Sequence, residues 1–339
     1  MILQKSQTGL HKATGTQYIA FLLTFFLICS CSRQEKVHEI TGSGIGTSYK
    51  ILYTGTENPD MPQSVDAVIQ EISSQFSIFD TNSLVARLNR GINVPLTPDF
   101  ITVFEASQKV SAMTDGAFDI TVGSLVNLWG FGPNRKKQAS SEFVDSLRKG
   151  VGYRKVRIEN NLLYRENNTV SLNFNAIAKG FCVDKLAEMM KTKGYQNFMI
   201  EVGGEIRMSG SKNGKSWMIG IQVPTTTANG AVEANYIFSA DNKSIATSGN
   251  YRNYTEENGV RYAHIINPKS GYPEQTTLLS VTVLSDECAI ADAFATAFMV
   301  LGVDKSMKIL EKERYLEALF IYDENGIFKI KKTAGFPDS

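Results

Sequence analysis

The period of the hydrophobic positions changes along this chain, and the changes predict a succession of strands and helices. Alternating apolar residues indicate half-buried strands, whereas apolar residues spaced three and four apart indicate one face of a helix. The predicted strands are 46–53, 155–158, 162–165, 170–174, 198–202, 205–210, 217–222, 236–240, 244–248, 263–266, 280–284 and 318–322. The predicted helices are 64–76, 83–89, 97–114, the end of 116–128, 141–149, 178–193, 289–301 and 305–313. This order predicts an α+β fold with mixed, largely antiparallel sheets and clustered helices, in a single large domain of two lobes.

The composition fits a globular protein and gives no sign of a nucleic-acid partner. The 339 residues are 42% hydrophobic, which is enough to build a large core. Lys and Arg total 35 against 34 acidic residues, so the chain lacks the basic excess typical of nucleic-acid binding. No GxGxxG segment precedes a predicted helix, and there is no P-loop, so the common dinucleotide and phosphate motifs are absent from the sequence.

The first 31 residues have the pattern of a bacterial lipoprotein signal peptide. A mildly basic start with Lys5 and Lys12 precedes an apolar stretch at 18–28, which is short for a membrane span. Small residues then precede Cys31, which we expect to be lipidated. Segment 32–43 would be a polar tether and 44–330 the folded domain. A plain signal peptide or an anchor helix is the alternative; two or more acyl chains would hold the protein to a membrane surface outside the cytoplasm.

The cysteines and histidines of the expected folded body are few. Cys182 and Cys288 both lie in apolar helical patterns, so we expect two buried free thiols. A disulfide between them is the alternative. Because His11 falls in the leader and His38 in the tether, His264 is the only histidine expected in the folded domain.

Asp292 and Thr296 are the polar exceptions in an otherwise apolar helical segment. Four residues apart, they lie on one helical face about one turn from each other. Burying a carboxylate and a hydroxyl without partners is unfavourable. Two hard oxygen donors suit a divalent cation such as magnesium. Alternatively, Asp292 begins the helix and Thr296 bonds back to its own backbone.

Two further segments combine small residues with charge. The segment NFNAIAKG at 173–180 joins a predicted strand to a predicted helix, whose first amides would attract phosphate beside the charge of Lys179. An ordinary surface turn is the alternative. In EVGGE, the pair Gly203 and Gly204 permits either close backbone approach to a ligand or a simple hairpin turn.

Six segments taken in order resemble one known family. They are GAFD from 116, NFNAIAKG from 173, EVGGEI from 201, IATSGNY from 245, HIINPKSG from 264 and ADAFATA from 291. The set is similar to that of the ApbE family, the FAD:protein FMN transferases, and covers about 44–322. A lipoprotein leader is also common in that family. The resemblance therefore implies an ApbE-like fold.

The resemblance also implies an activity and a site. Members transfer FMN from FAD to a threonine hydroxyl of a target protein, with magnesium, and release AMP. The metal would be held by the backbone carbonyl of Ala176 and the side chains of Asp292 and Thr296. The FAD would contact Ala117, Phe118, Asp119, Asn173, Lys179, Gly203, Gly204, His264 and Ile266. The implied acceptors are flavin-carrying subunits of membrane redox complexes.

The catalytic roles follow from the chemistry of phosphoryl transfer, which needs positioning and charge neutralisation. Lys179 would add positive charge at the phosphates. His264 is our candidate for the base that takes the threonine proton, and Asp292 or Asp119 is the alternative. The chain departs from the family pattern where Asn173 and Asn267 replace aspartates; the first removes a carboxylate from the flavin site.

Two other functions remain open on the sequence. Water competes with a threonine hydroxyl for the same phosphorus, so a magnesium-dependent FAD pyrophosphatase that yields FMN and AMP is one alternative. A non-catalytic, periplasmic flavin-binding lipoprotein is the other. The intact set of Ala176, Asp292 and Thr296 argues against such a carrier, which needs no metal at the diphosphate.

Overall fold

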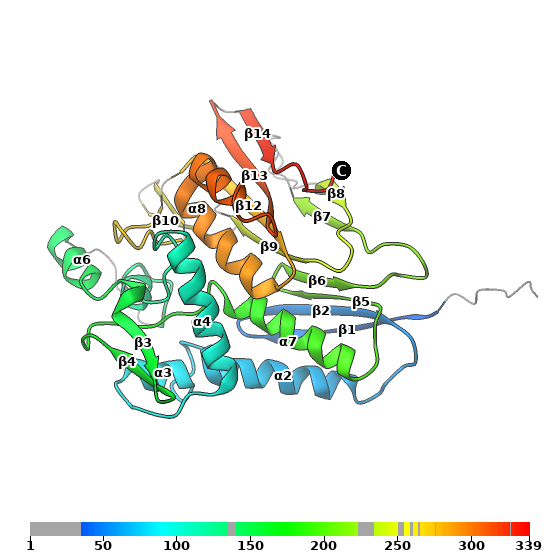
Figure 1. The fold of residues 1–339 in the computed structure, drawn as a ribbon, viewed down its shortest axis with the longest axis horizontal. Helices are drawn as coiled ribbons and strands as arrows, with labels where there is room; N and C mark the ends of the chain where they lie inside the picture. The colour runs from blue at the N-terminus through cyan, green and yellow to red at the C-terminus, as the bar shows by residue number, and fades with distance from the viewer. Residues whose placement is uncertain are drawn as a thin grey trace, which may run out of the picture. The chain divides into compact units, whose positions relative to one another are not determined.

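An eight-stranded antiparallel sheet organises the chain in the computed structural model (Figure 1). The structure describes residues 35–133, 140–222, 234–249, 254–257, 260–263, 265–274, 276–325 and 327–339. Lys36–Ser339 forms one compact unit. The large sheet runs through this unit, and the division of the unit into two lobes stays a prediction.

The strand order of the large sheet is β1-β2-β5-β6-β9-β12-β13-β14, and every neighbouring pair is antiparallel. Its strands are β1 Val37–Gly44, β2 Thr47–Thr54, β5 Phe198–Val202, β6 Glu205–Ser209, β9 Ser244–Gly249, β12 Leu278–Ser285, β13 Glu317–Glu324 and β14 Ile327–Lys332. Among the described residues, three two-stranded antiparallel sheets accompany it: β3 Val156–Glu159 with β4 Leu162–Arg165, β7 Ile219–Gln222 with β8 Ala234–Phe238, and β10 Tyr254–Glu257 with β11 Val260–Ala263.

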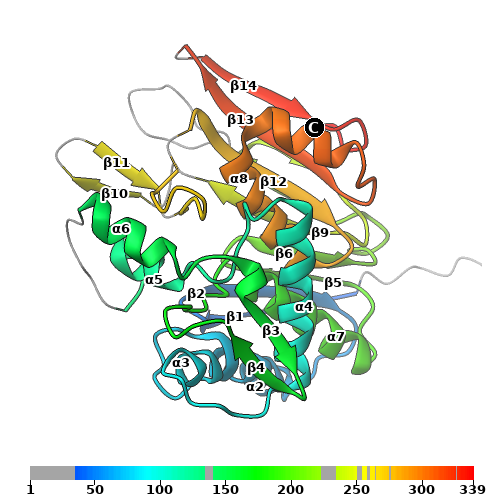
Figure 2. The ribbon, with the colours of Figure 1, turned by 60° about the vertical axis from the view of Figure 1, so that its left-hand side comes forward.

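Helices cover one face of this sheet, as Figures 1 and 2 show for α2, α4, α7 and α8. The helices are α2 Met61–Phe76, α3 Leu84–Asn89, α4 Pro98–Met113, α5 Gly123–Leu128, α6 Ser141–Arg148, α7 Ala178–Thr192 and α8 Cys288–Leu310, with a 3₁₀ turn η1 at Tyr153–Lys155. Several begin at a residue whose hydroxyl caps the helix: the hydroxyl of Thr97, for example, accepts a hydrogen bond from the amide of Phe100 at 3.1 Å.

The core has two sides because strand residues alternate between the two faces of the sheet. In β13, Ala318 and Phe320 belong to the hydrophobic cluster under the helices. Their neighbours Leu319 and Ile321 belong to a second cluster on the opposite face, with β7, β8 and Phe336. The large sheet is therefore buried on both faces along this strand, which explains its continuous apolar sequence.

The predicted tether is wrong from residue 37 onward. Val37–Gly44 forms the edge strand β1, paired with β2 through its whole length. His38 is buried, stacks on Tyr53, and has Nε2 3.1 Å from the carbonyl oxygen of Gly55, so His264 is not the only histidine of the folded body. At the other end, β14 and the buried Phe336 extend the domain beyond residue 330.

Three smaller expectations had different outcomes. The predicted strand 170–174 is wrong, because this segment forms one isolated bridge, between Val122 and Ser171, and no strand. The two helices predicted at 289–301 and 305–313 are present as α8, which is broken at Gly302, where φ is 74°. Cys182 and Cys288 are buried free thiols, as predicted.

Candidate active site

The predicted site residues converge on one cavity of about 840 Å³. Its walls include Ala117, Phe118, Asp119, Asn173, Ala176, Lys179, Gly203, Gly204, Ile266, Asp292 and Thr296. His264 lies outside the described residues, but its neighbours Ile265 and Ile266 line the cavity. Every predicted site residue that the structure describes is therefore at this one place, although the residues come from distant parts of the sequence.

The junction of α7 and α8 forms one wall of the cavity. A Cβ atom on Gly180 would lie 2.4 Å from the carbonyl oxygen of Cys288, so the two helices touch backbone to backbone. Asp184 of α7 then caps α8: its two carboxylate oxygens accept hydrogen bonds from the amides of Cys288 and Ala289, each at 2.9 Å. Arg207 of β6 donates to the same carboxylate at 2.6 Å. These contacts fix the start of α8, which carries Asp292.

Asp292 reaches back to α7 and changes its first turn. The amide of Gly180 donates to Oδ2 of Asp292 at 3.0 Å. In a continuous helix this amide would bond the carbonyl of Ala176. No hydrogen bond between described backbone groups ends on that carbonyl oxygen, and Ala176 lines the cavity. The carbonyl oxygen of Ala176 and Oδ1 of Asp292 thus have no hydrogen bond among the described groups, and both residues line the cavity.

Thr296 lies one turn along α8 from Asp292, as its spacing predicts. Its hydroxyl is 3.2 Å from the hydroxyl of Ser248 on β9, so Thr296 bonds across to the sheet. Among the described residues there is no group of three or more His, Cys, Asp or Glu that could hold a metal ion. The expected donor set contains one carboxylate, one carbonyl and one hydroxyl, which are the hard oxygen ligands that Mg²⁺ takes, usually together with water.

Lys179, Glu205 and Asp292 form a charged cluster in the cavity. The Nζ of Lys179 lies 2.5 Å from Oε1 of Glu205 and 3.9 Å from Oδ1 of Asp292. Both carboxylates are almost wholly buried, with 3% and 4% of the side chain exposed, whereas the lysine side chain keeps 31%. The lysine ammonium therefore faces the cavity from between two carboxylates.

Burial and charge together set the protonation of this cluster. Burial lowers the pKa of Lys179, but the carboxylates of Asp292 and Glu205 outweigh it and hold that pKa above its usual value. Burial raises the pKa of Glu205 to about 7, against the opposing charge of Lys179. Burial also raises the pKa of Asp292, which Lys179 and the amide of Gly180 lower in part. Lys179 is thus a cation at neutral pH.

The Gly203–Gly204 pair makes the tight turn between β5 and β6. Both residues have positive φ angles, of 61° and 102°, a backbone conformation that is unfavourable for residues with a side chain. A Cβ on Gly203 would lie 2.8 Å from the side chain of Thr47, so the turn also lies against β2. The hairpin interpretation is confirmed, and the turn lines the cavity as well.

Asp119 lines the cavity, but both of its carboxylate oxygens accept hydrogen bonds from other residues of the chain. Oδ1 accepts from the amide and the hydroxyl of Thr121, at 2.8 and 2.6 Å, and Oδ2 accepts from the amide of Tyr153 at 2.7 Å. Burial raises the pKa of Asp119, and these hydrogen bonds lower it in part. Asp119 therefore holds a loop in place and is poorly suited to the alternative role of a catalytic base.

The two asparagines that depart from the family pattern both organise turns. Oδ1 of Asn173 accepts from the amide of Asn175 at 2.8 Å, as a carboxylate would. Oδ1 of Asn267 accepts from the amide of Lys269 at 2.9 Å, and its Nδ2 donates to Glu274 at 2.8 Å. An ionised aspartate at 267 could not donate to Glu274, so asparagine suits this turn better.

Comparison with known proteins shows the family of this chain. The sequence model of the ApbE family matches residues 45–320. This chain belongs to the ApbE family. An FAD:protein FMN transferase of Haemophilus influenzae is 36% identical over 91% of this ApbE-family chain and 93% of the relative. One of Vibrio cholerae is 32% identical over 94% and 97%.

Solved structures of ApbE proteins have the same fold as this chain. The flavin transferase ApbE from Vibrio cholerae superposes with a TM-score of 0.82 at 32% identity, over 89% of this chain and 98% of that one. The apo form of the flavinyl transferase ApbE of Pseudomonas stutzeri gives 0.80 at 32% identity, over 90% and 96%. The predicted α+β class and ApbE-like fold are confirmed.

Two polar residues of this ApbE-family site have no role in the sequence-based prediction. Glu205 lies inside the segment EVGGEI, whose glycines alone were given a role, and Ser248 lies inside IATSGNY. The sequence contains a feature that could have indicated a role for Glu205. A glutamate at the first position of a strand, directly after a Gly–Gly turn, is unusual if that position faces the core.

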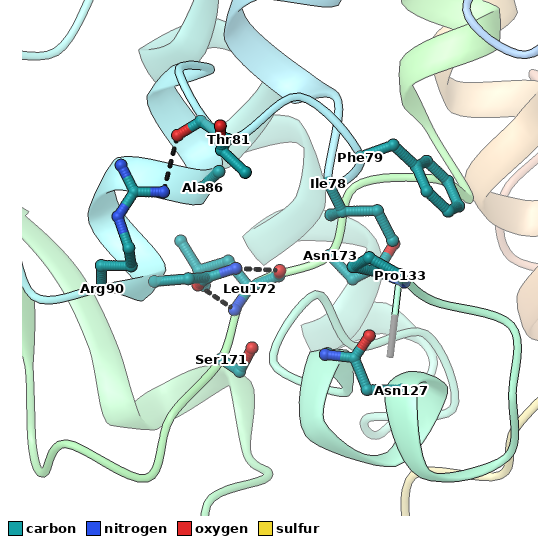
Figure 3. A pocket seen from close by; sticks show the side chains of 12 residues that line it. Ile78, Phe79, Thr81, Ala86, Arg90, Asn127, Pro133, Ser171, Leu172 and Asn173 are labelled. Carbon is teal, nitrogen blue, oxygen red and sulfur yellow. Dashed lines mark hydrogen bonds between the residues drawn. The ribbon is translucent and has the colours of Figure 1, made fainter. Parts of the chain in front are cut away.

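A second cavity, of about 360 Å³, adjoins the first in this ApbE-family chain, because Ile78, Phe79 and Asn173 line both. Figure 3 shows these three residues together on one side of it. The side chain of Asn89 donates to the carbonyl of Leu172 at 2.9 Å and accepts from its amide at 2.7 Å. Helix α3 thereby fixes the backbone next to Asn173 in the wall shared by the two cavities.

Proposed function

We propose that this chain transfers FMN from FAD to a threonine hydroxyl of an acceptor protein in a magnesium-dependent reaction. The observation that carries the proposal is the convergence of Ala176, Lys179, Asp292 and Thr296 on one cavity. The names of the relatives support flavin transfer. The oxygen-rich corner at Asp292 supports the metal, and the cationic Lys179 supports a diphosphate beside it.

The transfer exchanges the phosphoanhydride linkage of the FAD diphosphate for a phosphoester linkage to the acceptor. The acceptor oxygen forms a bond to the phosphorus of the FMN half, and the bond between that phosphorus and the bridging oxygen breaks. The electron pair of the broken bond leaves on AMP, and the hydroxyl proton passes to a base. His264 is our candidate base, because it adjoins the cavity-lining Ile265 and an imidazole accepts protons near neutral pH.

The residues at the α7–α8 junction would hold the diphosphate and the metal. The carbonyl of Ala176 and the side chains of Asp292 and Thr296 would bind Mg²⁺, which supplies positive charge to the diphosphate when bound. Lys179 has hydrogens beyond the one that it donates to Glu205, and these would reach the phosphate oxygens. The Gly203–Gly204 turn allows the nucleotide to approach the backbone closely.

Incubation with FAD, Mg²⁺ and an acceptor polypeptide that carries a single threonine tests the function. We expect the acceptor to gain the mass of one FMN less one water and an equal amount of AMP to appear. The same polypeptide with alanine at that position should gain no mass. Transfer that proceeds unchanged in excess EDTA would contradict the metal requirement.

The pyrophosphatase alternative gives a different product pattern in the same assay. It predicts that free FMN and AMP accumulate at the same rate with the threonine and the alanine polypeptides. A flavin-binding lipoprotein without turnover predicts no AMP in either case. The measured ratio of protein-bound to free FMN therefore separates the three functions.

We further propose that the protein is anchored outside the cytoplasm by lipid on Cys31, for action on flavin-carrying subunits of membrane redox complexes. The leader pattern supports this, while Cys31 itself lies outside the described residues. No helix of the described ranges has both the length and the hydropathy of a membrane span.

Replacing Cys31 by serine tests the anchor. We expect the wild type to sediment with membranes and the Cys31→Ser variant to be released into the soluble extracytoplasmic fraction, because acyl chains provide the membrane affinity. Mass spectrometry of the mature N-terminus should show an acylated cysteine in the wild type. A mature N-terminus that is unmodified and lies at another residue would rule out lipidation of Cys31.

A further inference from the structure

Lys179 lies between two buried carboxylates and is hydrogen-bonded to only one of them. It donates a hydrogen bond to Oε1 of Glu205, while Oδ1 of Asp292 remains 3.9 Å away, beyond hydrogen-bond distance. Asp292 has one described hydrogen bond, from the amide of Gly180, and this bond occupies Oδ2. Its Oδ1 is therefore the atom for which a lysine ammonium and a metal ion would compete.

The competition matters because the cluster is buried. Two opposite charges attract far more strongly in a poorly hydrated site than in water. A lysine side chain has a flexible four-carbon stem and could cover the short remaining distance to Asp292. An ammonium bonded to Oδ1 would exclude a divalent cation, because both need the same lone pairs. Something must therefore hold the ammonium away from this oxygen.

Glu205 has the position needed to do this. It is the first residue of β6, and it follows the Gly203–Gly204 turn, so its backbone is fixed by the sheet. It is 2% exposed, and Oε2 has no hydrogen-bond partner among the described residues. Arg207, the next cation along β6, is paired with Asp184. Among the described side chains, the ammonium of Lys179 is therefore the cation that is hydrogen-bonded to Glu205.

We propose that Glu205 is a positioning residue that holds Lys179 away from Asp292 and so keeps Asp292 available to a divalent cation. The inference rests on the proposed function, since it assumes that Asp292 binds the metal. In this arrangement Lys179 is an internal competitor of the metal, and Glu205 restrains it. The same contact leaves the lysine facing the cavity, where it can bind phosphate oxygens.

Binding of Mn²⁺ to the apo protein, followed by electron paramagnetic resonance, tests the inference without any turnover. We expect Glu205→Ala to weaken Mn²⁺ binding about tenfold, which corresponds to a lysine that occupies Asp292 for about nine-tenths of the time. The double variant Glu205→Ala/Lys179→Met should bind Mn²⁺ within about threefold of the wild type, because the competitor is gone. Glu205→Gln, which keeps an acceptor oxygen for Lys179, should fall between the wild type and Glu205→Ala.

Crystal structures of the wild type and of Glu205→Ala provide a second measurement. We expect Nζ of Lys179 to move within hydrogen-bond distance of Oδ1 of Asp292 in the variant. A lysine that stays in its wild-type position overturns the inference. So does Mn²⁺ binding that remains weak in the double variant, since this would make Glu205 a metal ligand or a purely structural residue.

Asp292→Asn separates this inference from the proposed function. If Mn²⁺ binds the Asn variant as tightly as the wild type, the metal assignment itself fails. If Asp292→Asn abolishes binding while Glu205→Ala leaves it unchanged, the metal assignment stands and only the role of Glu205 fails. Melting temperatures of all variants show whether each is folded at the temperature of the measurement.

Discussion

Replacing Asp292 by asparagine is expected to lower the rate of AMP release from FAD roughly a thousandfold. The amide keeps an acceptor for the Gly180 N–H but removes the negative charge that would bind Mg²⁺. Loss of the charge stabilisation that a metal supplies, taken as about 4 kcal/mol, corresponds to a factor of this size. The rate is measured at saturating FAD by chromatography of AMP.

The same variant should not lose stability. Burial raises the pKa of Asp292, so the folded state favours its protonated form, and this contribution to stability declines as the pH rises through that pKa. At pH 8 without metal, Asp292→Asn should therefore melt no lower than the wild type. Thr296→Ser, which keeps the hydroxyl oxygen, is the matched control and should retain most activity, whereas Thr296→Val should not. An unchanged rate of AMP release by Asp292→Asn would contradict the assignment of a metal site at Asp292.

Replacing Gly180 by alanine is expected to destabilise the protein by about 2 kcal/mol, although alanine favours helices. The added Cβ would lie 2.4 Å from the carbonyl oxygen of Cys288, so α7 and α8 must separate. Overpacking of this kind usually costs about 1–3 kcal/mol, and it outweighs a helix preference of roughly 1 kcal/mol. Urea denaturation measures the difference.

Separation of the helices should also weaken binding of Mn²⁺, because the amide of Gly180 and Oδ2 of Asp292 meet across the same contact. Lys191→Ala is a suitable control, since it introduces the same residue on the same helix at an exposed position. The control should change the free energy of unfolding by less than about 0.5 kcal/mol. If Gly180→Ala were as stable as the wild type, the close contact between α7 and α8 would be wrong.

The sequence predicted those parts of the fold that local patterns determine. The helical spacing of α2 and α7, the alternation of β12 and the continuous apolar run of β13 were sufficient. A separation of four residues was enough to place Asp292 and Thr296 on one helical face. The six ordered segments placed the remaining site residues, because a family resemblance carries information about distant contacts. All those that are described line the same cavity.

The misses have non-local causes. Strand β1 contains two glycines and follows the leader, and only its pairing with β2 makes it a strand. The segment 170–174 alternates like a strand, but apart from one isolated bridge no described strand pairs with it. The carboxylate of Asp119 accepts hydrogen bonds from Thr121 and from Tyr153, which is distant in the sequence. The contact between Glu205 and Lys179 could not be predicted from local sequence, because the two residues are 26 positions apart and meet only in the folded protein.

The cap of α8 by Asp184 has a consequence for biosynthesis. Its two hydrogen bonds join residues that are 104 and 105 positions apart. While a ribosome is still translating the region between them, α7 can form, but the helix that bears Asp292 does not yet exist. A chain that ends before residue 288 would therefore lack Asp292 and Thr296, so the expected metal ligands are complete only when the last part of the chain is present.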